Sequence, residues 1–172
     1  MSLVNEIVAT RARMTPCIDR FVNMTPHHLA FVSQDPHASC VKVLAPSGCV
    51  LRAKVGASEV IGTVPSLFAE GDGTAIPASV IVHSLPLYEG IAVAGAPSID
   101  RTRDAGILVS RRVGETFEQF YRAGRIDELR AQLGLEAGSE ELAVYSPDST
   151  SRRPLPDGSL ACTAVIAFDV VF

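Results

Sequence analysis

Four short polar clusters hold the side chains of this chain that are best suited to chemistry. The first reads Asn23-Met24-Thr25-Pro26-His27, where the proline favours an extended conformation for the residue before it. Asn and Thr in such positions commonly bond their own backbone and stabilise a turn. The alternative is that His27 points into a pocket, as a polar contact to a ligand or as an acid or base. Both interpretations stay open at this point.

The second cluster joins a turn to an arginine. Residues 45–48 read Ala-Pro-Ser-Gly, a composition typical of a turn between two strands, and they include Ser47. Arg52 follows within a strand predicted over 50–55, where it shares one face with Lys54. That face is either solvated, or Arg52 supplies a fork for a carboxylate or phosphate group.

The third cluster, Ile107-Leu108-Val109-Ser110, predicts a buried strand that ends where a helical segment begins. Ser110 is a good candidate for the N-cap of that helix. The same position favours an anion, because a helix N-terminus carries partial positive charge and two arginines follow Ser110 directly.

The fourth cluster is Ser146-Pro147-Asp148-Ser149, which follows a predicted strand and precedes a loop containing Arg152 and Arg153. A Pro-Asp-Ser turn requires no function. Alternatively, Asp148 and Ser149 close a polar pocket from a second direction.

Several common catalytic motifs are absent from the sequence. It contains no GxSxG elbow, phosphate-binding P-loop, GxGxxG or HExxH motif. The four cysteines include no CxxC pair, so neither a metal site nor a cofactor is predicted. A Ser-His-Asp grouping can be drawn from Ser110, His27 and Asp148, although such a grouping has little specificity by itself.

Composition narrows the class of protein. Fifteen Lys and Arg against 19 Asp and Glu give a net charge of −4, which argues against a nucleic-acid binder. An apolar fraction of 47% predicts a folded globular chain. No apolar run is long enough to span a membrane, and the first residues have neither the basic segment nor the long apolar segment typical of a secretory signal. We therefore expect a cytoplasmic protein with reduced cysteines.

Short runs rich in Val, Ile and Leu alternate with turn residues through the first hundred positions, which predicts a β-rich region with tight connections. The expected strands are Leu29–Ser33, Cys40–Leu44, Val50–Val55, Glu59–Val64, Val80–His83 and Ile91–Ala94.

After residue 112 the apolar residues recur with the period of a helix. Val113, Phe117 and Phe120 recur at helical spacing, and the pattern continues to about residue 133, so one kinked helix or two short helices are expected over 113–133. Strands over 141–145 and 161–171 predict a C-terminal β-hairpin, whose second strand is apolar on both faces and is expected in a central position. The fold class is therefore α+β, with a mainly antiparallel sheet and the helices packed on it. Residues 1–20 are expected to be an N-terminal extension, and 21–172 a single domain.

In their order and spacing, the four clusters resemble a family of small uncharacterised proteins from tailed phages, actinobacteria and some fungi. Its members typically read NLTPH, then PPSG followed by an Arg, then GLP, YIVS and PDT ahead of a hairpin. The stretch Gly95-Ala96-Pro97 is similar to the GLP element. The resemblance spans roughly residues 21–170 and implies that the polar clusters belong to one arrangement, either a shared site or a buried polar network.

Two departures stand out. Leu108 replaces part of the aromatic-rich YIV, and this chain carries the N-terminal segment and a longer helical region. The resemblance implies no established activity.

Three functions follow as hypotheses. The first is non-enzymatic binding of a small anionic, nucleotide-like ligand, because hydroxyl, amide, imidazole and guanidinium groups suit phosphate and ribose. The second is a structural protein of phage-related origin that forms homo-oligomers. The third is a small hydrolase or transferase in which His27 is the base and Asp148 orients it. In this hypothesis Ser110 or Ser47 is the nucleophile or a binding group. The candidate ligand-binding residues are Asn23, Thr25, His27, Ser47, Arg52, Ser110 and Asp148.

Overall fold

The computed structural model describes residues 18–35, 37, 41–69, 71–84, 87–100, 102–135 and 142–171. They fall into two compact units. Unit 1 takes its described residues from Met1–Ala53 and Gly90–Phe172, and unit 2 is the intervening segment Lys54–Glu89. The predicted N-terminal extension lies largely outside the described residues, which begin with a short 3-10 helix, η1 (Ile18–Arg20).

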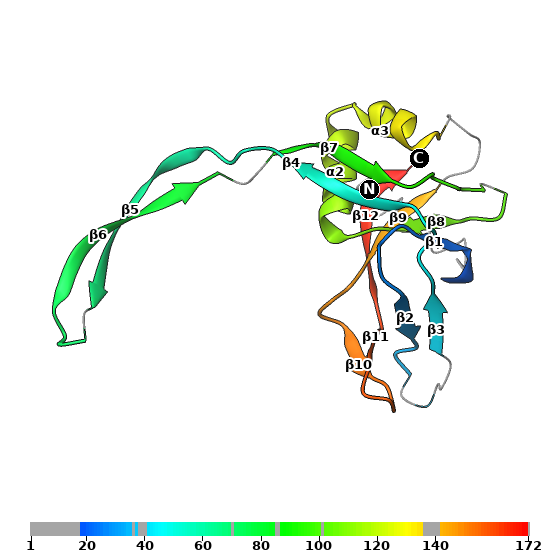
Figure 1. The fold of residues 1–172 in the computed structure, drawn as a ribbon, viewed down its shortest axis with the longest axis horizontal. Helices are drawn as coiled ribbons and strands as arrows, with labels where there is room; N and C mark the ends of the chain where they lie inside the picture. Colours follow the sequence, from blue (N-terminus) through cyan, green and yellow to red (C-terminus); the bar gives the residue numbers. More distant parts are fainter. Residues whose placement is uncertain are drawn as a thin grey trace, which may run out of the picture. The chain divides into compact units, whose positions relative to one another are not determined.

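A mixed sheet forms the centre of unit 1 (Figure 1). Its strands, in spatial order, are β1 (Phe21–Asn23), β8 (Gly106–Leu108), β9 (Ala143–Pro147) and β12 (Val165–Val171). The pairs β1/β8 and β8/β9 are parallel, whereas β9 and β12 are antiparallel. Ile107 and Leu108 are completely buried on the interior strand β8, as the apolar run 107–109 predicts.

Two helices, α2 (Arg111–Arg122) and α3 (Ile126–Leu133), confirm the helical region predicted over 113–133. α2 packs on this sheet against β9 and β12, and α3 packs against α2. Gly124 separates them with a φ of 70°, and Gly134 ends α3 with a φ of 64°. Both values lie in the left-handed region that glycine adopts most readily. In the described part of the chain, no helix has the length and apolar composition needed to cross a membrane.

The core of unit 1 lies between α2 and the sheet. Val113 and Phe117 are completely buried, and Phe120 is 4% exposed, so the predicted apolar stripe of the helix faces inward. Gly114 lies on the same face, against the ring of Phe168 in β12. Because glycine has no β-carbon, the helix can approach the strand closely at this point.

The predicted C-terminal hairpin is confirmed, because β9 and β12 pair antiparallel with Tyr145 opposite Ala167. Between them the chain forms a smaller antiparallel pair, β10 (Arg152–Pro154) and β11 (Leu160–Cys162). The expected central position of the last strand is wrong, since β12 lies at an end of the sheet. Its apolar residues are accounted for by α2, which covers one face of β12 at Phe168.

A second sheet has the order β10-β11-β2-β3, where β2 is Leu29–Val32 and β3 is Val41–Leu44. β2 pairs antiparallel with β3 and parallel with β11. A small apolar cluster connects this sheet to the central one, and within it the rings of Phe21 and Tyr145 lie 5.1 Å apart. Antiparallel pairs outnumber parallel pairs among the described strands, which confirms the predicted α+β class.

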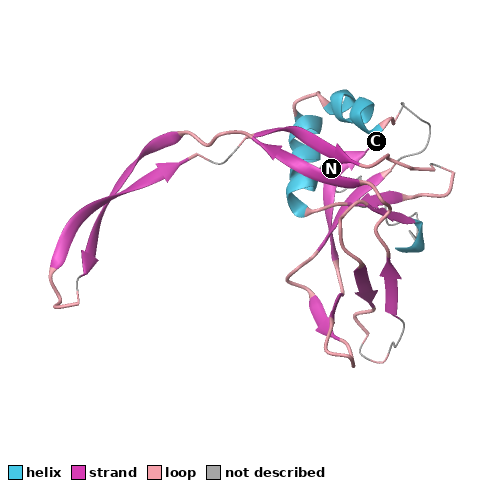
Figure 2. Cartoon of the chain, in the orientation of Figure 1, coloured by secondary structure: helices cyan, strands magenta, loops and turns pink. Residues whose placement is uncertain are grey.

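The remaining strands lead into and through unit 2 (Figure 2). β4 (Val50–Val55) pairs with β7 (Tyr88–Ala94), and Leu51 and Ile91 join the core of unit 1. Between them, β5 (Val60–Ala69) and β6 (Ala75–His83) form a long antiparallel ribbon. Both strands extend beyond the segments 59–64 and 80–83 that the sequence predicts.

Candidate functional site

Asn23 shapes the loop at one side of the candidate site. Its side chain, 2% exposed, accepts hydrogen bonds through Oδ1 from the backbone N–H of Thr25 at 3.0 Å and from the Thr25 hydroxyl at 2.7 Å. Its Nδ2 donates to the carbonyl oxygens of His27 and Leu44 at 2.8 and 3.1 Å. These bonds support the turn interpretation of the first cluster, with His27 exposed at the end of the loop.

A cleft of about 460 Å³ lies beside this loop, entirely within unit 1. It brings together four residues that the sequence predicts as site residues. Thr25 and His27 line it from the loop, Arg52 from β4, and Ser110 from the position before α2. The lining also includes Arg111, Ser146, Ser149 and Arg152.

Three arginines reach this cleft from three different elements. Arg52 belongs to β4, Arg111 to the first turn of α2, and Arg152 to β10, and all three are exposed. Glu115 partly neutralises Arg111, whose Nε donates to Glu115 Oε1 at 3.0 Å. The described residues that line the cleft include neither Asp nor Glu. The cleft is therefore positively charged, and its guanidinium groups have the fork geometry that binds carboxylates and phosphates.

Hydroxyl groups line the same cleft. Thr25 and Ser146 are 8% and 2% exposed, whereas Ser110 and Ser149 are exposed. Ser110 occupies the N-cap position of α2 in an extended conformation, as predicted, but its hydroxyl makes no capping bond to the described residues of that helix. The first N–H groups of any helix also lack a carbonyl one turn earlier, so the start of α2 adds donors at this edge of the cleft.

Asp148 is not among the described residues that line the cleft. Its carboxylate accepts hydrogen bonds from the Thr150 hydroxyl and N–H at 2.7 and 2.9 Å and from the Ser151 hydroxyl at 3.0 Å. These bonds lower the pKa of the Asp148 carboxyl below its ordinary value of 3.8, with the Thr150 hydroxyl as the largest cause. Asp148 thus closes its own turn, and a Ser-His-Asp grouping around His27 would lack its carboxylate at the cleft.

Ser47 and Asn23 line a different cleft, of about 450 Å³, together with Arg103 and Asp104. The Ser47 oxygen accepts a hydrogen bond from the N–H of Cys49 at 3.3 Å, as expected for a turn. The predicted site residues therefore do not all surround one cavity.

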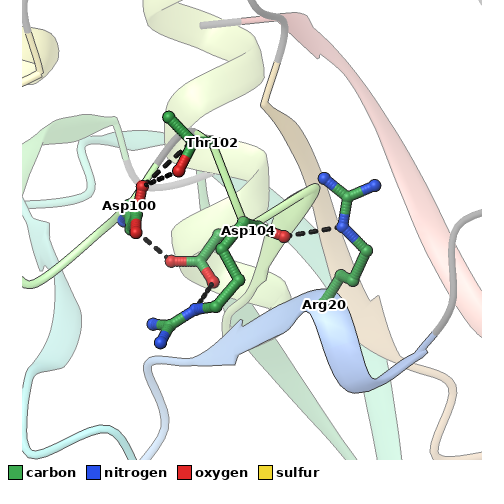
Figure 3. Close-up of polar contacts among 5 residues, drawn as sticks. Arg20, Asp100, Thr102 and Asp104 are labelled. Atoms are coloured by element: carbon green, nitrogen blue, oxygen red, sulfur yellow. Dashed lines mark hydrogen bonds and ion pairs between the residues drawn. The ribbon is translucent and has the colours of Figure 1, made fainter.

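Arg103 and Asp104, which line this second cleft, belong to a loop held by polar contacts (Figure 3). Asp104, 6% exposed, accepts a bond from the N–H of Asp100 at 2.8 Å and pairs with Arg103 Nε at 3.2 Å. Asp100 in turn accepts a bond from the Thr102 hydroxyl at 2.6 Å, and Arg20 donates to the carbonyl oxygen of Arg103 at 2.6 Å. These side-chain and backbone bonds fix the loop that enters β8.

The candidate ligand set from the sequence omits Arg111, Ser146, Ser149 and Arg152. Arg111 directly follows Ser110, while the other three lie within or just beyond the fourth cluster, so the signal is their proximity to polar clusters. Their convergence depends on β9 lying next to β8 and on the start of α2, which is a non-local arrangement.

No family model, curated protein or solved structure matches this chain. Among the described residues, no three His, Cys, Asp or Glu side chains gather in a way that could hold a metal ion. The chemistry of the site therefore has to be inferred from the lining of the cleft itself.

Proposed function

We propose that unit 1 binds a small anion, such as a nucleotide or another phosphate- or carboxylate-bearing ligand, in the cleft lined by Arg52, Arg111 and Arg152. The observation that carries the proposal is the convergence of these three guanidinium groups with four hydroxyl-bearing residues in one cleft. Guanidinium groups and hydroxyls together bind the charged and the neutral oxygens of such ligands.

The size of the cleft fits this class of ligand. A volume of about 460 Å³ falls in the range of roughly 300 to 1,000 Å³ that is usual for small-molecule sites. Leu29 and Leu51 add apolar surface to its lining, against which the ring of a base could pack. Asn23 and Ser47 lie outside this cleft, and Asn23 contributes to it by fixing the loop that carries His27.

The proposal is tested by thermal denaturation and titration calorimetry with inorganic phosphate, adenosine mono- and triphosphate, and citrate. A ligand at 100 times its dissociation constant adds about 2.7 kcal/mol, which for a chain of this size corresponds to roughly 5 to 10 °C. A panel in which none of these anions raises the melting temperature contradicts the proposal.

Matched arginine variants locate the site. Arg52→Ala and Arg152→Ala should each weaken binding about tenfold to hundredfold, since a charge-assisted hydrogen bond contributes about 1.5 to 3 kcal/mol. Arg112→Ala is the control, because Arg112 is exposed on the same helix turn as Arg111 but does not line the cleft. Equal weakening by all three variants would indicate a general charge effect and contradict a defined site.

The same panel separates binding from hydrolysis. His27 and Ser110 line the cleft, so we also propose incubating the protein with phosphate and carboxylate esters and assaying the products. Turnover that disappears in His27→Gln would favour the hydrolase hypothesis. Binding that survives His27→Gln without turnover favours a binding protein.

The wider biological setting is part of the proposal. We infer a cytoplasmic protein that does not bind nucleic acid, on the basis of its net charge of −4 and the composition described above. The resemblance to the phage and actinobacterial family is likewise a hypothesis, and it is consistent with the four clusters contributing to one region.

A further inference from the structure

The exposed apolar surface of the molecule is concentrated in unit 2. Eleven large apolar side chains are exposed in the described part of the chain, and eight of them lie within residues 54–89. The other three, Val41, Val43 and Leu160, belong to the second sheet of unit 1. Scattered exposed apolar residues are normal, but a contiguous group usually marks an interaction surface. The eight are Val55, Val60, Ile61, Val64, Ile76, Val80, Ile81 and Leu87.

The ribbon formed by β5 and β6 has two apolar faces. Val64 lies opposite Val80, and cross-strand partners share a face, which we call face A; Ile76 lies on it as well. Ile81 lies on the other face, face B, together with Val60. Val80 is 46% exposed and Ile81 58% exposed, so neither face is covered.

Neither strand of the ribbon contains a charged residue. The ten residues of β5 and the nine of β6 include no Asp, Glu, Lys or Arg. Natural edge strands are usually protected from association by such charges. An isolated two-stranded ribbon is also only marginally stable in water, so this one needs a cover that is itself apolar and uncharged.

Two prolines indicate that a partner covers the faces of the ribbon rather than pairing with its outer edges. Pro65 lies in β5 opposite Ser79, and Pro77 lies in β6 opposite Leu67, so the register puts both prolines in the same class of cross-strand pair. A proline keeps the ladder intact only where its nitrogen faces outward. Each outer edge therefore lacks one N–H donor, and a further strand adding to either edge would lose a hydrogen bond.

The small area of each face of the ribbon indicates that both faces are covered. Strands of ten and nine residues give a ribbon roughly 30 Å long and 10 Å wide, so one face offers roughly 300 Å². A stable interface buries about 800 Å² on each partner. A single face-to-face contact is smaller than this, so a copy that uses both faces, each against a different copy, buries roughly twice the area of a copy that uses one.

We propose that the cover is the ribbon of further copies of this chain, stacked through both faces, in an assembly of more than two copies. Among the described residues, the exposed surface that matches the ribbon in length and in lack of charge is the ribbon itself. An interface formed through two unlike faces propagates from copy to copy and forms a ring where the rotation closes. This inference is independent of the anion cleft, whose residues lie in unit 1.

Substitutions on each face test the assembly by light scattering. The full chain should have a mass of more than two times 18.2 kDa. Val80→Lys on face A and Ile81→Lys on face B should each reduce that mass. Val43→Lys on β3 is the control, because Val43 is 58% exposed, as is Ile81, but lies in unit 1. An assembly that persists in both ribbon variants, or that Val43→Lys also disrupts, overturns the proposal.

Hydrogen exchange on the unaltered chain gives a second readout that does not depend on the folding of any variant. Exchange of the β5 and β6 amides should slow as protein concentration rises, while exchange in β8 stays constant. A chain that is monomeric at every concentration, or an assembly with unprotected ribbon amides, contradicts the proposal. A monomer that binds vesicles of phosphatidylcholine would show instead that lipid covers the ribbon.

Discussion

Gly114 of α2 lies against the ring of Phe168 of β12, so that a β-carbon at this position would overlap the ring. The helix starts at the edge of the cleft, and the contact with Phe168 sets how deeply it packs on the sheet. The position of Arg111 and Ser110 therefore depends on a glycine that lies within the core rather than in the cleft.

Gly114→Ala should destabilise the protein by about 1 to 3 kcal/mol, the usual cost of overpacking a core. Denaturant unfolding measures this, with Gln119→Ala on the exposed face of the same helix as the control. Adding Phe168→Leu should recover part of the loss, because the two residues are in contact. Strictly additive effects would mean that the loss has another cause.

Asn23→Ala should destabilise unit 1 by about 2 to 3 kcal/mol, because it removes four hydrogen bonds and leaves the buried N–H of Thr25 without its acceptor. Thermal or denaturant unfolding gives the value. Ser47→Ala, at an exposed position of the neighbouring turn, serves for comparison and should change stability by less than about 1 kcal/mol. Equal losses in the two variants would argue against a central role for Asn23.

Asp148 should contribute to the pH dependence of stability. Its pKa is lowered in the folded state by the Thr150 and Ser151 hydrogen bonds, so its contribution is present above the ordinary value of 3.8 and is lost as pH falls through the folded value. Asp148→Asn keeps an acceptor oxygen but does not titrate. We expect the wild type to melt above Asp148→Asn at neutral pH, and the difference to narrow in acid. A constant difference across this range would be inconsistent with the assigned hydrogen bonds.

Cys49 should react slowly with thiol reagents. It has no exposed surface, and burial raises the pKa of its thiol above the ordinary value of 9.0, which reduces the thiolate that reacts. Alkylation with iodoacetamide at neutral pH, followed by peptide mass mapping, should leave Cys49 unmodified until denaturant is added. Rapid labelling of the folded protein would show that this part of the core opens readily.

The sequence predicts the local elements of this fold better than their pairing. The strands at 29–33 and 50–55 are predicted because short runs rich in apolar residues are bounded by turn residues, and the helices because of the stripe at Val113 and Phe117. The parallel arrangement of β1, β8 and β9 is not predicted, since a three-residue strand such as β1 has no measurable period.

Prolines explain why the ribbon is longer than the sequence predicts. The strand expected to end at Val64 continues past Pro65 to Ala69, because proline fits at an outer edge and a two-stranded ribbon has two such edges. The residues of the cleft, like the strands, are predicted where the signal is local and missed where it depends on pairing. Local composition predicts Thr25, His27, Arg52 and Ser110 one by one. Arg152 joins them in the cleft only through the C-terminal hairpin.

The chain enters and leaves the ribbon through two segments whose backbones are hydrogen-bonded to each other. The N–H of Gly56 donates to the carbonyl oxygen of Leu87 at 2.8 Å, and the flanking strands β4 and β7 are neighbours in a sheet. The two ends of the insertion are thus held together before the ribbon begins, and doubling the length of such a closed loop costs only about 0.6 kcal/mol in chain entropy. Ribbon length is accordingly free to vary. A protein that contains unit 1 could have a longer, shorter or different ribbon without any change in the fold of unit 1, which holds the cleft.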